Sequence, residues 1–306
     1  FAFIDWIRLH TPTHPRVVVG PGDDCAVLER PENRLLVTTD LLMDGVDFVI
    51  AEVGPRRVGR KAMAVNLSDV AAMAGIPTAA VVSVALPKNG GREIGEQLFL
   101  GMRDVADAFG VPIVGGDTNS WNGGLVISVT VLGEATAKGP VLRAGAKPGD
   151  WIFATGPLGG SLLGKHLDFT PRIAEALALH AAVDLRAMID VSDGLAADLH
   201  HILEESRCGA VLDAAAIPIA PAAFDRAKQS GKTPLAHALG DGEDFELVFT
   251  VSPADGRTLL ETPPIPSLAK IGACVETGLW LERPAGREPL SPVGWVHDLA
   301  SSPGRS

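Results

Sequence analysis

Aspartates gather where the apolar segments of this chain end, and together they offer the oxygen ligands of a metal site. Hard cations such as Mg²⁺ bind carboxylate and hydroxyl oxygens. Any single aspartate could also be a turn residue or a helix cap. Ser192 and Asp193, for example, could cap the helix predicted after them. Massed without a cation, the carboxylates would repel one another, so the pattern predicts a shared Mg²⁺ site. The set is Asp23, Asp24, Asp40, Asp117, Asp190 and Asp193, with Asp69 inside a predicted helix.

The composition limits the classes of function. The chain has 306 residues, of which 46% are hydrophobic and 21% charged, the profile of a globular protein long enough for two domains. Its net charge of −11 argues against non-specific nucleic-acid binding, which needs a basic surface. A protein of this charge that handles a polyphosphate needs local positive charge, and metal ions can supply it.

The sequence favours a cytoplasmic protein that does not enter a membrane. No apolar run reaches the ~18 residues that span a bilayer. Residues 1–7, which we predict to begin an amphipathic helix, lack the basic leader of a signal peptide. Cys25, Cys208 and Cys274 are far apart and form no CxxC pair, as expected for reduced thiols, and they offer no zinc site.

Apolar periodicity predicts strands and helices in both halves, and therefore an α/β or layered α+β fold. Residues 139–150 form a turn-rich break, so we predict an N-terminal domain, 1–137, and a C-terminal domain, 138–306. The predicted strands are Val17–Val19, 35–39, 79–86, 111–114, 125–132, Trp151–Ala154, 210–212 and 245–251, and the predicted helices are 55–75, 93–109, 172–180, 192–206 and 235–239.

Two glycine-rich segments carry competing interpretations. Residues 159–166 nearly match the phosphate-binding GxxxxGK[ST] loop, but His166 replaces the metal-binding hydroxyl, so an ordinary turn into a helix is favoured. Glu243 and Asp244 lie in a glycine-flanked acidic loop before a strand, which is either functional or a solvated turn. The chain has no HExxH metal motif and no GxSxG nucleophile motif.

Seven short motifs follow one another along the chain. They are 22–26 (GDDCA), 38–40 (TTD), 66–73 (NLSDVAAM), 115–118 (GGDT), 143–150 (RAGAKPGD), 190–195 (DVSDGL) and 242–247 (GEDFEL). In this order they resemble the thiamine-monophosphate kinase family, and the resemblance runs from about Phe3 to Trp295. It implies an N-terminal α/β domain whose sheet pairs across a homodimer, beside a C-terminal α/β domain that completes the active site.

The resemblance also implies a reaction and its residues. The reaction is ATP-dependent phosphorylation of thiamine monophosphate to thiamine diphosphate, with several Mg²⁺ ions. An acid suits a cationic, amino-bearing ligand, and an indole can stack on its rings. By matched position the metal ligands would be Asp24, Thr38, Thr39, Asp40, Asp69, Asp117, Asp190 and Asp193; the nucleotide contacts would be Phe99, Gly116, Asp117, Arg143 and Ser192; and the substrate contacts would be Asp47, Glu243 and Trp295.

Three positions depart from the family pattern. Asp47 stands where the family usually has a histidine near the substrate, and an anion there would repel the substrate phosphate unless a metal or an arginine intervened. Phe99 replaces a tyrosine beside the nucleotide, which keeps the stacking surface and loses the hydroxyl contact. Asp241 replaces a common glycine and so could alter the loop that carries Glu243.

We expect direct in-line transfer of the γ-phosphoryl group, with positioning and Mg²⁺ supplying most of the acceleration and no separate general base. Arg143 is expected to stabilise charge on the polyphosphate; the alternative is a salt bridge at the domain boundary. Two other functions stay open. One is another ATP-dependent synthetase or ligase of the aminoimidazole-ribonucleotide-synthetase-like superfamily, and the other is a non-catalytic nucleotide- or metal-binding sensor.

Overall fold

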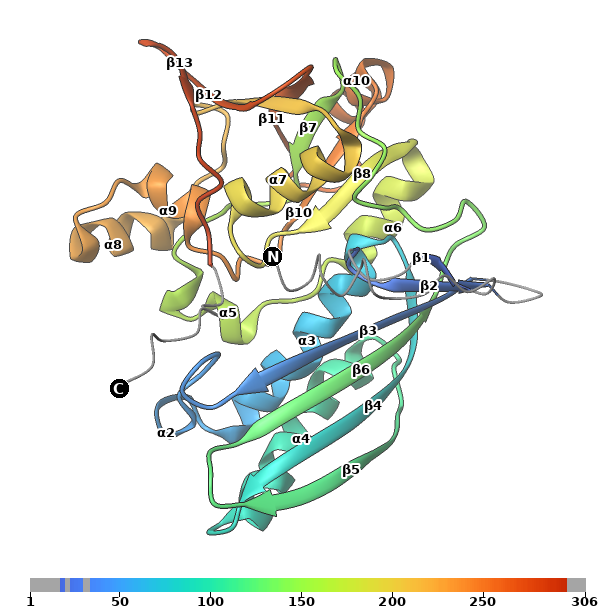
Figure 1. Ribbon diagram of the computed structural model, residues 1–306, viewed down its shortest axis with the longest axis vertical. Coiled ribbons are helices and arrows are strands. Elements are labelled where there is room, and N and C mark those ends of the chain that lie inside the picture. Colours follow the sequence, from blue (N-terminus) through green and yellow to red (C-terminus); the bar gives the residue numbers. More distant parts are fainter. Residues whose placement is uncertain (1–16, 20–22, 30–33, 296–306) are drawn as a thin grey trace, which may run out of the picture.

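The computed structural model describes residues 17–19, 23–29 and 34–295, which form two sheets with helices packed against them (Figure 1). The helix predicted at residues 1–7 lies outside the described residues. The α/β class expected from the sequence is confirmed. None of the described helices is both long and apolar enough to cross a membrane.

The first sheet has six strands in the order β1-β2-β3-β6-β4-β5, and β4 and β5 are the parallel pair. Helices α3 and α4 cover one of its faces, and no helix of the described residues covers the other face (Figure 1). The elements of this half are β1 (Val17–Val19), β2 (Ala26–Glu29), β3 (Arg34–Met43), α2 (Ile50–Val53), α3 (Pro55–Ala72), β4 (Ile76–Pro87), α4 (Gly91–Ala108), β5 (Ile113–Trp121) and β6 (Val126–Glu134).

Strand β3 is longer than the sequence predicted, and this changes the setting of Asp40. The predicted strand ended at Thr39, but β3 pairs with β6 without interruption as far as Met43, so Asp40 lies inside the strand. Side chains alternate between the faces of a strand. Thr38 is buried on the helix-covered face, whereas the exposed Thr39 hydroxyl lies on the bare face and donates to the Val129 carbonyl at 3.0 Å.

The second sheet has seven strands in the order β13-β12-β9-β11-β7-β10-β8, and β9 and β12 are the parallel pair. Its strands are β7 (Trp151–Ala154), β8 (Leu185–Asp190), β9 (Gly209–Asp213), β10 (Leu247–Val251), β11 (Ala269–Val275), β12 (Leu279–Arg283) and β13 (Gly286–Pro289). Its helices are η1 (Ser161–Leu163), α5 (Lys165–Asp168), α6 (Ile173–Ala182), α7 (Leu195–Ser206), α8 (Pro221–Ser230), α9 (Pro234–Gly240) and α10 (Pro253–Glu261).

Side chains along the central strands of this sheet point alternately to its two faces, and each face packs in its own apolar layer. Ile152 and Val248 pack in one layer with residues of α7 and α9. Phe153 and Phe249 stack on each other, with ring centroids 5.6 Å apart, and join the layer that contains α6 and α10. That second layer continues into the core of the first sheet, since α3 packs against both β3 and β8. The domain boundary between residues 137 and 138 stays a prediction.

Two glycines let α3 and α4 approach closely. A Cβ atom at Gly59 would lie 2.0 Å from the Leu98 carbonyl oxygen, and one at Gly101 would lie 1.8 Å from the Arg56 carbonyl oxygen. Any larger residue would therefore push the two helices apart. Because α3 carries several residues of the site described below, this spacing also fixes their position.

We predict that Gly101→Ala lowers the free energy of unfolding by about 1–3 kcal/mol, since the added methyl meets backbone rather than a side chain that can move. Urea denaturation measures the change. Gly95→Ala on the same helix is the control, because its Cβ would meet the flexible Leu86 side chain at 3.2 Å and alanine favours a helix by ~1 kcal/mol over glycine. Equal stability of the two variants would contradict the close-packing role.

Candidate active site

Three aspartates that are far apart in the sequence converge between the two sheets. Asp24 precedes β2, Asp69 lies in α3, and Asp190 is the last residue of β8. Each offers a carboxylate oxygen, and the three oxygens lie within 4.8 Å of one another. Both halves of the chain therefore contribute to one cluster of acids, as the sequence predicted for these residues.

Two hydroxyl groups hold this cluster from the helix-covered side of the first sheet. Thr38 Oγ1 donates to Asp69 Oδ2 at 2.5 Å. Ser68 Oγ, from the residue before Asp69, donates to Asp190 Oδ2 at 2.5 Å. The first bond joins β3 to α3 and the second joins α3 to β8, so the acids are positioned by rigid elements.

Arg143 balances part of the negative charge. Its guanidinium donates to both carboxylate oxygens of Asp24, from Nε at 3.0 Å and from Nη2 at 2.8 Å, and its backbone N–H donates to Asp23 Oδ2 at 3.1 Å. Burial, together with the charge of Asp24, raises the pKa of Asp23 to about 6. In the chain alone Arg143 therefore forms the boundary salt bridge that the sequence left as an alternative, and its role toward a polyphosphate stays a prediction.

The electrostatics of the cluster favour a cation. Burial, reinforced by the charge of Asp24, raises the pKa of Asp190 to about 7. Burial and then the charges of Asp47 and Asp24 raise the pKa of Asp40 to about 6. Burial and the neighbouring Asp40 and Asp190 hold the pKa of Asp69 well above its usual range. A cation removes the repulsion that causes part of these shifts, so a hard ion such as Mg²⁺ fits this oxygen-only donor set.

A cavity of about 390 Å³ opens onto this cluster. Its acidic wall includes Asp40, Asp69 and Asp190, and Lys61 is the only Lys or Arg among the described residues that line it. The lining therefore combines carboxylates with apolar and aromatic side chains, and such a lining can receive both a cation and an apolar ring. The apolar lining is formed by Leu41, Leu42, Val46, Val65, Leu162, Phe245 and Trp295.

All three predicted substrate residues line the cavity. Asp47 is turned toward its own loop, where Oδ2 accepts the Met43 N–H at 2.7 Å. Glu243 Oε1 accepts from Lys61 Nζ at 2.5 Å. Trp295 donates its backbone N–H to the Asp193 carbonyl at 2.9 Å and is 55% exposed. Their contacts with a substrate stay predictions.

The loop that carries Glu243 has a strained backbone. Glu243 has φ = 53° and Phe245 has φ = 50°, a left-handed region that costs roughly 1–2 kcal/mol for each non-glycine residue. Backbone hydrogen bonds hold both residues, from Glu243 to the Ser192 carbonyl at 2.6 Å and from Phe245 to the Val191 carbonyl at 2.8 Å. Strain that the surroundings maintain in this way is typical of functional loops, and here the loop lines the cavity.

Asp241, a departure from the family pattern, supports this loop. Its Oδ1 lies 2.7 Å from His237 Nδ1, and its Oδ2 accepts the Gly160 N–H at 3.0 Å. The neighbouring Asp244 accepts the Gly159 N–H through both oxygens, at 2.9 and 2.8 Å. The aspartate in place of glycine therefore ties the Glu243 loop to the turn after β7.

The same contacts argue against a phosphate-binding loop at residues 159–166. A P-loop aims its backbone N–H groups at phosphate, but those of Gly159 and Gly160 are bonded to Asp244 and Asp241. Lys165 Nζ donates to the buried Glu246 at 2.8 Å and does not line the cavity. The segment is the ordinary turn into a helix that the sequence favoured.

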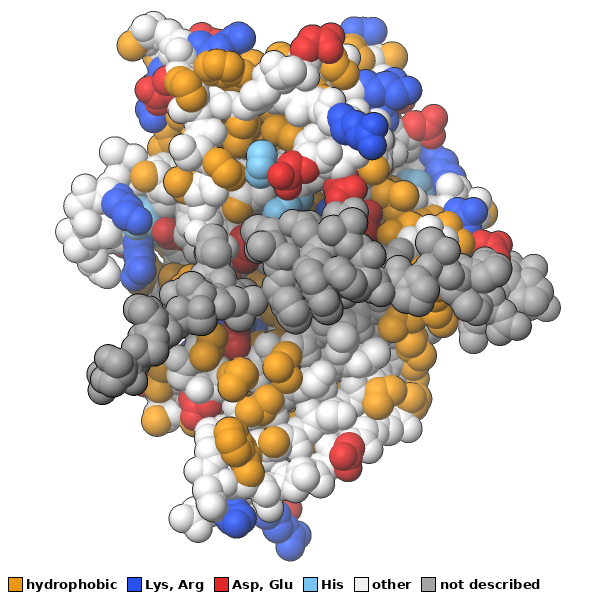
Figure 2. All heavy atoms as spheres, in the orientation of Figure 1, with side chains coloured by type: hydrophobic (Ala, Val, Ile, Leu, Met, Phe, Trp, Pro, Cys, Tyr) orange, Lys and Arg blue, Asp and Glu red, His pale blue; other side chains and the backbone are white. Residues whose placement is uncertain are grey.

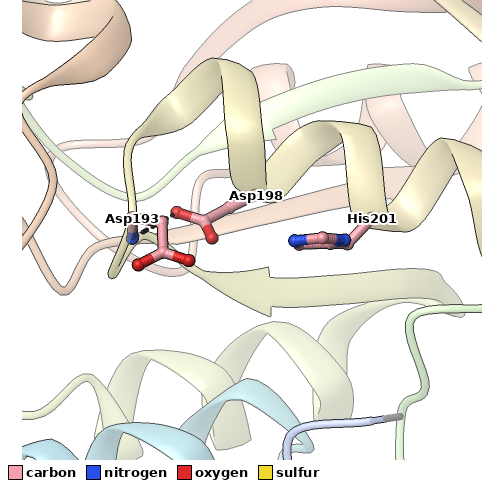
Figure 3. A group of neighbouring side chains, drawn as sticks. All are labelled: Asp193, Asp198 and His201. Atoms are coloured by element: carbon pink, nitrogen blue, oxygen red, sulfur yellow. Dashed lines mark hydrogen bonds between the residues drawn. The ribbon is translucent and has the colours of Figure 1, made fainter. Parts of the chain in front are cut away.

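Asp193 belongs to a neighbouring group at the start of α7, together with Asp198 and His201 (Figure 3). Asp198 is buried and accepts the backbone N–H groups of Asp193 at 3.0 Å and Gly194 at 2.9 Å, which fixes the first turn of the helix. Asp193 and Ser192 both line the cavity beside Asp190. The structure thus places Asp193 next to the predicted metal site, in a separate set of ligand atoms.

The structure does not bring every predicted site residue to the cluster. Phe99, Gly116 and Asp117 line a second groove of about 680 Å³ between α4 and strands β4 and β5. Asp117 lies within β5, because the strand runs beyond the predicted 111–114. Thr39 faces the bare side of the first sheet, as described above. Nucleotide or metal contacts at these four residues stay predictions.

Two family models match successive parts of the chain. Family models described as "AIR synthase related protein" match residues 22–135, for the N-terminal domain, and 147–277, for the C-terminal domain. Thiamine-monophosphate kinase of Rhodopirellula baltica is 42% identical over 97% of this chain and 96% of its own. The chain belongs to the thiamine-monophosphate kinase family.

Solved structures of the family agree with the fold. The structure described as "AaThiL complexed with AMPPCP and TMP" has a TM-score of 0.82 and 30% identity, covering 96% of this chain and 95% of its own. Thiamine monophosphate kinase from Aquifex aeolicus has a TM-score of 0.79 and 28% identity, covering 92% and 96%. The family's two-part α/β architecture is therefore present along nearly the whole chain.

The sequence analysis missed Lys61, Ser68 and His166, all of which lie at the site. Lys61 carried the clearest signal, because it falls on the same helical face as the apolar Val58 and Val65. A lysine on a buried face is rare unless it is paired. Ser68 stood inside a quoted motif, but the sequence did not show that its hydroxyl faces Asp190.

We predict that the metal-free protein loses stability as pH rises from 5 to 8. A carboxyl whose folded pKa is raised binds a proton more readily in the folded state, so its stabilising effect is present at low pH and is lost as pH rises through the folded value. Folded Asp190 has a pKa of about 7. The free energy of unfolding of Asp190→Asn, relative to that of the parent, should therefore increase by roughly 2–4 kcal/mol as pH rises from 5 to 8. Chemical denaturation at several pH values in EDTA measures the difference. A difference that does not vary with pH would contradict the raised pKa.

Proposed function

We propose that this chain phosphorylates thiamine monophosphate to thiamine diphosphate with ATP as the donor. The observation that carries the proposal is a cavity whose lining combines apolar side chains with Asp69 and Asp190 of the Asp24–Asp69–Asp190 cluster. Relatives that cover nearly the whole chain bear the name thiamine-monophosphate kinase, and one family structure is described as containing AMPPCP and TMP. The carboxylate of Glu243 and the aromatic rings of Phe245 and Trp295 in the lining would suit a cationic ring system.

The oxygen-rich cluster would hold Mg²⁺, which would neutralise charge on the phosphates. The carboxylates of Asp24, Asp69 and Asp190 supply the most closely grouped oxygen ligands. Thr38 bonds to Asp69, and Asp40 lies close enough that, together with burial, the charge of Asp24 raises its pKa. Asp193 would serve a further ion from the neighbouring group. The number of ions is not part of the proposal.

The chain's own groups position the reactants. Arg143 already faces Asp24, and when a cation compensates that carboxylate, the guanidinium can stabilise a polyphosphate with its planar donor fork. No general base is assigned, since the acceptor phosphate is already anionic and the transfer depends on positioning and charge. The Glu243 carboxylate would accept hydrogen bonds from the amino-bearing ring of the thiamine moiety, and the Trp295 indole would stack on its rings.

A homodimer through the first sheet is part of the proposal. The face of this sheet without helices displays apolar side chains, and Figure 2 shows hydrophobic groups gathered over the first-sheet half. Leu41 and Met43, which alternate with the buried Leu42 along β3, are 59% and 38% exposed. Within one chain Asp117 lines the groove beside α4, whereas Asp24 belongs to the acidic cluster. If both residues contact the same nucleotide, one of them has to come from a second copy of the chain. The cytoplasmic location stays a prediction of the sequence.

Two other functions are separated from this one by their products. A synthetase or ligase of the same superfamily would release ADP with phosphate or would join a different acceptor. A nucleotide or metal sensor would bind ATP without turnover. Identification of the products after incubation with ATP, Mg²⁺ and thiamine monophosphate decides among the three.

We predict that ADP and thiamine diphosphate appear in equal amounts, and that Asp69→Asn reduces the rate by roughly 100-fold or more, because an amide keeps the shape and removes the charge that holds the cation. Chromatography of the products measures both. Asp225→Asn is the matched control, since Asp225 lies on the surface and pairs with Lys228. Formation of ADP with unchanged thiamine monophosphate, or full activity of Asp69→Asn at limiting Mg²⁺, would refute the proposal.

Light scattering tests the quaternary part. We predict a dimer at micromolar concentration, closed by a two-fold axis, because the same apolar sheet face is present on each copy. A stable monomer with full activity under the assay conditions would exclude a role for a second copy.

A further inference from the structure

Lys61 is a charged residue at the centre of the fold. It lies in the middle of α3 with 1% of its surface exposed, and it is one of the largest fully buried side chains among the described residues. Its neighbours on the helix, Val58, Ala62 and Val65, are buried and apolar. An ammonium in such surroundings is destabilising unless it is well paired, so its partners should explain its presence.

Those partners come from two walls of the cavity. Lys61 Nζ donates to Glu243 Oε1 at 2.5 Å and to the Asp47 carbonyl oxygen at 2.8 Å. Asp47 lies in the loop between β3 and α2 in the first half, and Glu243 lies in the loop before β10 in the second half. One ammonium therefore fixes the spacing between two loops that both line the cavity.

The pairing also sets the direction of the Glu243 carboxylate. Its Oε1 is occupied by Lys61, and its backbone is held in a left-handed conformation by the bond to the Ser192 carbonyl. The side chain is 26% exposed and lines the cavity, so Oε2 is the oxygen left to accept from a ligand. A carboxylate restrained at both its backbone and one oxygen loses little further conformational entropy when a ligand binds.

We propose that Lys61 is a positioning residue for the phosphoryl acceptor. It holds Glu243 and the Asp47 loop at the separation that receives the amino-bearing ring system of the acceptor. This inference rests on the proposed function. Lys61 acts through Glu243 and the Asp47 loop, and Asp69 of the cluster lies about two turns further along α3, so Lys61 governs the binding of the acceptor and leaves the binding of ATP alone.

The test begins with Lys61→Met, which keeps a long unbranched side chain and removes the ammonium. The KM for thiamine monophosphate should rise roughly tenfold to a hundredfold, the range expected for loss of a charged hydrogen bond. The kcat and the KM for ATP should stay within about threefold of the parent, because ground-state binding of one substrate is what is lost. A change in kcat and in both KM values together would indicate a merely structural role and overturn the inference.

A double-variant cycle with Glu243→Gln tests whether Lys61 acts through Glu243. Glu243→Gln alone should raise the KM for thiamine monophosphate in the same range, and Lys61→Met should then add less than about threefold on that background. Multiplying effects would overturn the inference. If Lys61→Met does not fold, the Glu243→Gln variant still decides, because an unchanged KM there contradicts a positioning role for its partner.

Lys165→Met is the matched control. Lys165 also pairs with a buried glutamate, Glu246, but it does not line the cavity. Thermal denaturation should show a lower Tm for this variant, and its KM for thiamine monophosphate should match the parent's. A parent enzyme that makes no thiamine diphosphate would refute the proposed function itself, whereas an active parent with an unaffected Lys61→Met variant would refute the role of Lys61 alone.

Discussion

The repulsion among buried carboxylates is the constraint on which the rest of this structure depends. Asp24, Asp69 and Asp190 present oxygens within 4.8 Å of one another, and burial disfavours the charged forms of Asp69 and Asp190. The fold opposes this repulsion with Arg143 on Asp24 and with a hydroxyl on each of the other two acids. A cation would remove this repulsion, and this is the physical basis of the Mg²⁺ site that we propose at the cluster.

Helix α3 connects this cluster to the first sheet, to α4 and to the rest of the cavity. It lies between the two sheets and carries Asp69 and Ser68 for the cluster, and Lys61 for the contact with Glu243. Asn66 on the same helix accepts the Asp40 backbone N–H at 3.0 Å, which ties the helix to β3. Because the glycine contacts with α4 fix the place of α3, packing far from the cavity sets distances within it. Residues from both halves of the chain are therefore held in one site by α3.

The sequence predicted the α/β class and much of the site, because ordered motifs and apolar periodicity are local properties. It ended a strand at Thr39, since an aspartate follows, but pairing with β6 carries β3 through Asp40 to Met43. Strand alternation could have shown that Thr38 and Thr39 face opposite sides. The partner of Lys61 and the order of the second sheet depend on contacts between distant segments, which local patterns do not contain.

Calorimetric titration of the cluster with Mg²⁺, in the presence of a non-hydrolysable ATP analogue, measures the central claim most directly. Run at pH 6.5 in two buffers of different ionisation enthalpy, it counts the protons released on binding. We predict net proton release that diminishes as pH rises toward 8, because carboxyls with raised pKa values, such as Asp190 at about 7, must lose protons to bind a metal. Asp190→Asn should bind more weakly and release fewer protons. Tight binding with no proton release at pH 6.5, unchanged in Asp190→Asn, would contradict a metal site at these carboxylates.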